Sequence, residues 1–101
     1  MAVTCTSLEQ VRENIDRLDH QIVTLLAERG GFVSQAARFK KDTDGAKAPQ
    51  RVEQVIAKIR DLSHAVGANP EVTERVYRTM TAAFIQKELT EHAALMTAPQ
   101  V

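Results

Sequence analysis

A chain of 101 residues has the length of one domain, and its 13 basic and 13 acidic residues cancel, which excludes the broad positive surface of a nucleic-acid binder. No apolar run reaches the roughly 18–20 residues of a membrane span, and residues 1–7 show no signal-peptide pattern. The one cysteine, Cys5, allows neither an internal disulfide nor a structural zinc site, so we expect a protein of the reducing cytoplasm.

The composition is typical of helices. Aromatic residues make up 4% of the chain, with only 4 Gly and 3 Pro, while Ala, Leu, Val, Glu, Gln, Lys and Arg are common. We therefore expect an all-α fold with three helices in a single domain that spans residues 1–101.

The first predicted helix spans residues 7–41 and begins with two overlapping capping boxes, Thr6 with Glu9 and Ser7 with Gln10. Its apolar residues recur at alternating spacings of 3 and 4, which is a helical heptad pattern. They are Leu8, Val11, Ile15, Leu18, Ile22 and Leu25, here called the apolar stripe. The phase continues across Gly30-Gly31, although two interior glycines cost about 2 kcal/mol relative to alanine.

Two shorter helices are predicted to follow a polar segment, residues 41–47. One spans residues 49–66, with Pro49 at its first position and Gly67 as its stop. Asn69-Pro70 then provides a cap and a first turn for a helix over residues 70–94.

The length of the first helix predicts a dimer. About 35 residues at 1.5 Å per residue give a helix of roughly 52 Å, which a hairpin of two shorter helices covers only in part. An intertwined homodimer is the simplest way to bury the rest of the apolar stripe. The alternative is a monomeric bundle whose first helix bends at Gly30-Gly31.

Two cations, Arg29 and Lys40, occupy positions in phase with the apolar stripe, where a buried charge needs an anionic partner. Arg12 lies beside the stripe, roughly 25 Å from Arg29 along the axis, so one small ligand cannot reach both from one helix. In antiparallel copies of this helix, Arg12 of one chain would approach Arg29 and Lys40 of the other, and Arg51 could join them. A small dicarboxylate suits such a pocket. Ordinary ion pairs or snorkelling side chains are the alternative.

These residues, taken in order, resemble the all-helical chorismate mutases of type II. The similarity covers about residues 5 to 93 and rests on an ordered set of short segments. They are residues 8–19 (LEQVRENIDRLD), 22–29 (IVTLLAER), 36–40 (AARFK) and 48–52 (APQRV). Cys5-Thr6, residues 38–40 and residues 48–52 are most similar to the isochorismate pyruvate-lyase branch of this family.

The resemblance implies a role for each matched residue. Arg12, supplied by the partner chain, and Arg29 would hold the carboxylates of chorismate or isochorismate. Lys40 would contact a carboxylate and the ether oxygen whose bond breaks, and Glu88 would contact the same oxygen. Arg51 would support the carboxylate site. The reaction is a pericyclic rearrangement, so the resemblance implies no metal and no cofactor.

Two positions depart from the common pattern and leave the exact reaction open. Val52 stands where many mutases have a Glu that binds the substrate hydroxyl, and Glu88 stands where many have Gln. A carboxylate cannot donate a hydrogen bond to an ether oxygen, whereas a protonated acid can. Glu88 could instead pair with Lys87 or Lys40, or face solvent. The expectation is a mutase, with the lyase as the first alternative and a non-catalytic helical metabolite-sensing or dimerisation module as the second.

Overall fold

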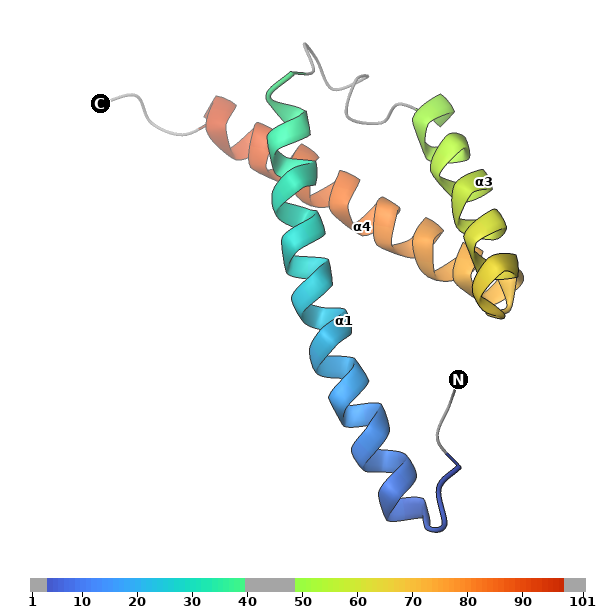
Figure 1. The fold of residues 1–101 in the computed structure, drawn as a ribbon. Helices are drawn as coiled ribbons and strands as arrows, with labels where there is room; N and C mark the ends of the chain where they lie inside the picture. Colours follow the sequence, from blue (N-terminus) through green and yellow to red (C-terminus); the bar gives the residue numbers. More distant parts are fainter. Residues whose placement is uncertain (1–3, 40–48, 98–101) are drawn as a thin grey trace. The chain divides into compact units, whose positions relative to one another are not determined.

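The computed structural model describes residues 4–39 and 49–97, and the regular secondary structure in those ranges is helical. The helices are α1 (Leu8–Ala37), α3 (Pro49–Val66) and α4 (Pro70–Thr97) (Figure 1). Neither range contains a β-strand, so the predicted all-α class is confirmed for this part of the chain. None of these helices is long and apolar enough to cross a membrane.

The start of α1 is fixed by side-chain caps. The Ser7 hydroxyl accepts a hydrogen bond from the Gln10 amide at 3.1 Å, which satisfies one of the free N–H groups of the first turn. The Gln10 side chain reaches back and accepts the Thr6 amide at 2.9 Å. Of the two predicted boxes, Ser7 with Gln10 thus provides the cap, and Thr6 bonds to Gln10 rather than Glu9.

The helix α1 runs through Gly30-Gly31 without interruption and ends at Ala37. The expected end, residue 41, lies outside the described residues, and a turn replaces the helix at Arg38 and Phe39. Their amides bond to carbonyls three residues back, at 3.1 and 3.0 Å, which tightens the end of the helix.

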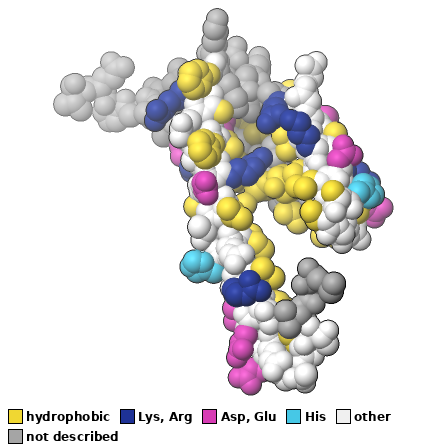
Figure 2. Space-filling model, in the orientation of Figure 1, with side chains coloured by type: hydrophobic (Ala, Val, Ile, Leu, Met, Phe, Trp, Pro, Cys, Tyr) yellow, Lys and Arg dark blue, Asp and Glu magenta, His cyan; other side chains and the backbone are white. Residues whose placement is uncertain are grey.

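The apolar stripe of α1 is exposed along its whole length. The exposed fractions of its side chains run from 39% for Val11 to 62% for Leu8, and no residue of α1 is buried. Hydrophobic surface follows the helix in the space-filling view (Figure 2). An amphipathic helix of this kind gains most of its stability from packing that apolar face against another element.

The turn between α3 and α4 is built from local signals. Gly67 has a φ of 77°, the left-handed conformation that ends many helices. The Ala68 amide donates to the Ser63 carbonyl at 2.9 Å and satisfies a free carbonyl of the last turn. The Asn69 Oδ1 then caps α4 by accepting the Glu71 and Val72 amides at 2.9 and 3.3 Å.

Polar contacts next to this turn join α3 to α4. The hydroxyl oxygens of Ser63 and Thr73 lie 2.6 Å apart in a hydrogen bond, and Ser63 is 3% exposed. Ile56 is the one hydrophobic side chain that is buried among the described residues. The apolar core of the hairpin is therefore small, and polar contacts have more influence on its geometry than in a large domain.

Farther from the turn, an ion-pair network of four residues crosses between the two helices. Arg78 donates to both oxygens of Glu53 at 2.8 and 2.9 Å and to Glu74 at 2.8 Å, and Arg60 donates to the other Glu74 oxygen at 2.8 Å. The bonds from Arg78 hold the pKa of the Glu53 carboxyl below its usual range. Those from Arg78 and Arg60 do the same for the pKa of Glu74, and the two carboxylates raise the pKa of Arg78.

Alanine substitutions at Gly31 and Gly67 should change the stability in opposite directions. A side chain at Gly67 is strained by the positive φ, so Gly67→Ala should lower the free energy of unfolding by about 1 kcal/mol. A Cβ at Gly31 would meet nothing within 4 Å in a regular helix, so Gly31→Ala should raise it by about 0.5–1 kcal/mol. Urea titrations of both variants measure this, and changes of the same sign would contradict it.

The ion-pair network should also make the stability depend on pH. Because folding lowers the pKa of Glu53 and Glu74, the unfolded chain binds more protons at acidic pH. The stabilisation is present above the ordinary Glu pKa of about 4.3 and is lost as pH falls through the lowered folded-state values. The difference in unfolding free energy between the parent and Arg78→Gln should therefore shrink between about pH 7 and about pH 3.

Arg75→Gln is the control for this measurement, since Arg75 is exposed on the same helix and has no ion pair within the ranges that the structure describes. Its effect on the free energy of unfolding should be small and equal at both pH values. A difference for Arg78→Gln that stays constant across pH would contradict the assignment.

Candidate functional site

Two of the predicted site residues, Arg12 and Arg29, lie on α1. Arg12 is exposed and Arg29 is half-buried. The helix between them is regular, so they stand about 25 Å apart along its axis. One copy of α1 therefore cannot bring both guanidinium groups to the same small ligand.

The third cation of the predicted set, Lys40, lies outside the described residues, as does the rest of segment 40–48. Its place in phase with the apolar stripe and its contact with the ether oxygen both stay predictions.

Arg51 and Val52 lie in the first turn of α3. Arg51 is the third residue of this helix and is exposed, whereas Val52 is half-buried. The positive end of the helix dipole disfavours a cation here, and the first turn of α3 carries no acidic residue that would offset it. Free backbone amides and a guanidinium at one helix end together favour a bound anion such as a carboxylate.

Glu88 lies on α4 in a setting unusual for a carboxyl group. It is half-buried, and its Oε2 atom is inaccessible to solvent with no hydrogen-bond partner in the described part of the chain. Lys87 forms its ion pair with Glu91 at 3.2 Å, so the predicted alternative of a Glu88–Lys87 pair is wrong. The other predicted alternative, a Glu88 side chain that faces solvent, does not hold for Oε2, because this oxygen is buried.

A buried carboxyl oxygen without a partner is costly unless the group is protonated or a ligand supplies a donor. Within residues 49–91, no hydrogen bond or ion pair joins Glu88 to Arg51. The hairpin therefore carries both groups, the anion-favouring first turn of α3 and the buried carboxyl of α4, without pairing them with each other.

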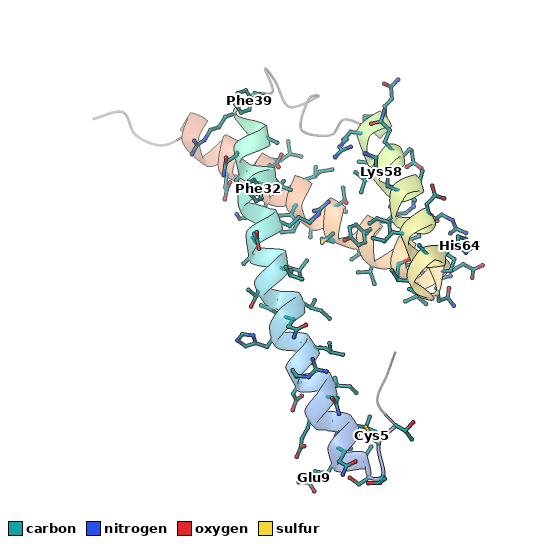
Figure 3. All side chains as sticks on the ribbon, in the orientation of Figure 1. Cys5, Glu9, Phe32, Phe39, Lys58 and His64 are labelled. Carbon is teal, nitrogen blue, oxygen red and sulfur yellow. The ribbon has the colours of Figure 1, made fainter. Side chains whose placement is uncertain are left out.

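Two histidines lie on the surface of their helices. His20 and His64 are exposed, and Figure 3 labels His64 on α3. No group of three or more His, Cys, Asp or Glu residues in those ranges is placed to hold a metal ion.

The sequence reasoning missed the ion-pair network of the hairpin. One signal was available, since Glu74 and Arg78 have the i, i+4 spacing that allows a pair on one helix. The link from Arg78 to Glu53, 25 residues away, depends on how α3 and α4 cross, and helical spacing alone does not reveal it.

Comparison with known proteins identifies the family of this chain. The model of the family described as chorismate mutase type II matches residues 11–89, which contain Arg12, Arg29, Arg51 and Glu88. A curated relative from Pseudomonas aeruginosa, named isochorismate pyruvate lyase, is 29% identical over 85 residues, or 84% of this chain and 84% of the relative. Because the family match covers most of the chain, the resemblance seen in the sequence is confirmed, and the chain belongs to the chorismate mutase type II family.

Proposed function

We propose that the chain is a chorismate mutase, which rearranges chorismate to prephenate in a cation-lined pocket shared by two copies of the chain. Family membership supports the reaction class. The observation that carries the proposal is the buried Oε2 of Glu88, which lacks a hydrogen-bond partner in the described residues. Such an atom suits a group whose partner is a polar atom of a bound substrate.

The chemistry needs little from the protein beyond position and charge. Within one molecule the ether C–O bond breaks while a C–C bond forms, through a cyclic transition state. Arg12 and Arg29 hold the carboxylates and so favour the compact, chair-like conformer that reacts. Lys40 stabilises the negative charge that develops on the ether oxygen, and Glu88, when protonated, donates a hydrogen bond to it.

The exposed stripe of α1 supports a homodimer as the form that carries the site. An exposed apolar face of this length is a typical interaction surface. An antiparallel second copy would cover it and would bring Arg12 of one chain toward Arg29 of the other. The roughly 25 Å between these residues on one helix is then no obstacle to a shared pocket.

The isochorismate pyruvate-lyase reaction is a second candidate, which specific observations favour. Val52 is apolar and half-buried where many mutases have a hydroxyl-binding Glu. The relative from Pseudomonas aeruginosa bears the name of this lyase. The lyase reaction passes through a related cyclic transition state and would use the same cations, so the two reactions differ in substrate more than in site.

A non-catalytic helical module that senses a metabolite of this kind is the remaining alternative. It would need the cations for binding but would convert neither compound. Turnover therefore separates it from both enzymes.

Separate incubation with chorismate and with isochorismate should show turnover of both, with chorismate preferred. Lys40→Ala should lower kcat/KM for the preferred compound by about 10²–10³-fold, because one preorganised donor to the ether oxygen is lost. Lys58→Ala, at an exposed lysine of α3, is the matched control and should have little effect (Figure 3). Unchanged turnover in Lys40→Ala would contradict the catalytic reading, and no turnover of either compound by the parent would favour the sensing module.

Glu88→Gln keeps the shape of the side chain and supplies an amide that can donate a hydrogen bond to the ether oxygen. Glu88→Leu supplies no donor, so its kcat/KM for the preferred compound should fall by about 10²-fold, while Glu88→Gln should retain activity. The measurement is kcat/KM of both variants and of the parent at one pH. Equal kcat/KM in the two variants would show that position 88 does not act as a donor.

A further inference from the structure

The ion-pair network of the hairpin includes one link that lies close to the start of α3. Helices α3 and α4 diverge from the turn near Gly67, so the first residues of α3 lie at the open end of the hairpin (Figure 1). The bond between Arg78 and Glu53 is the hydrogen-bonded link between α3 and α4 that lies nearest this open end in the described residues. Arg51, the candidate carboxylate-binding residue, is two positions from Glu53.

The geometry of this link is better than that of an ordinary surface pair. Single exposed ion pairs contribute little, and the side chains of Arg78 and Glu53 are 42% and 63% exposed. Arg78, however, donates to both oxygens of Glu53, and its Nε bonds to Glu74, which is itself held by Arg60. Bidentate geometry within a network is the case in which exposed charges do fix a structure.

Within one chain, apolar packing gives the open end little other support. The most buried side chains of α3 are Ile56 and Ser63, and none of residues 49–55 is buried. Arg51 stands roughly 18 Å along the helix from Ser63, where the hairpin is anchored near its turn. A rotation of about 5° at that anchor would move Arg51 by roughly 1.6 Å, which is enough to lengthen a hydrogen bond to a bound carboxylate beyond its usual range.

We propose that Arg78 is a positioning residue, which holds the first turn of α3 through Glu53 and so places Arg51 against a substrate carboxylate. This inference rests on the proposed function for the role of Arg51. The lowered pKa values of Glu53 and Glu74 agree with this role of Arg78, because they indicate that the ion pairs favour the charged carboxylates in the folded chain.

Steady-state kinetics separate positioning from a merely structural role. A carboxylate held by Arg51 is bound alike before and during the reaction, so Arg78→Gln should raise KM about fivefold and leave kcat within about twofold. A variant that only destabilises the fold reduces the active fraction, which lowers apparent kcat and leaves KM unchanged. Arg78→Lys keeps the charge, so its KM should lie between those of Arg78→Gln and the parent. The KM and kcat of Arg75→Gln should match those of the parent.

The double variant tests the route through Glu53. If Arg78 acts on Arg51 through this carboxylate, Glu53→Gln should raise KM in the same way, and Glu53→Gln/Arg78→Gln should be no worse than either single variant. Additive effects of the two substitutions on KM, or an unchanged KM in Arg78→Gln, would overturn the inference.

Hydrogen exchange gives a readout that does not need activity. Amides in the first turns of α3, within residues 50–56, should exchange at least about threefold faster in Arg78→Gln and Glu53→Gln than in Arg75→Gln. If the parent converts neither compound, the proposed function fails, and faster exchange would still support the hold on α3. If the parent is active but exchange is unchanged, the inference alone fails.

Discussion

An apolar helix face that carries a cation is the constraint on which the rest of this structure depends. The apolar stripe of α1 lies exposed along its length, and Arg29 lies in phase with it. Whatever covers the stripe also brings its own groups up to this cation, and a cation removed from water requires an anion. A partner that covers this face therefore also changes the surroundings of Arg29.

The hairpin of α3 and α4 plays a different part. It is closed near its turn by the Ser63–Thr73 hydrogen bond and held toward its open end by the link from Arg78 to Glu53. With little buried apolar surface, its geometry depends on directional polar contacts more than on volume filling.

The sequence predicts those features that are set by neighbouring residues. The Ser7 cap of α1, the stop at Gly67 and the restart at Asn69-Pro70 all follow from backbone chemistry within a few positions, and each appears in the structure. The end of α1 was predicted too late, because the heptad phase continues in the sequence after the backbone turns at Arg38.

Contacts between helices lay beyond what the sequence could predict. Whether Ser63 meets Thr73, or Arg78 meets Glu53, depends on the crossing of two helices, and helical periodicity does not specify it. The candidate site could be predicted from the sequence only in part. The resemblance identified Arg51 and Glu88, but only the structure shows that the Glu88 Oε2 is buried and that Lys87 pairs with Glu91 instead.

Activity recovered from two inactive variants tests the shared pocket most directly. Arg12→Ala and Arg29→Ala should each be inactive, because each removes one cation from both pockets of a dimer. Unfolded together and refolded, they should form mixed dimers with one intact pocket, and about one quarter of the parent activity per chain should return. Native mass spectrometry that detects mixed dimers without any recovered activity would contradict a pocket built from Arg12 of one chain and Arg29 of the other.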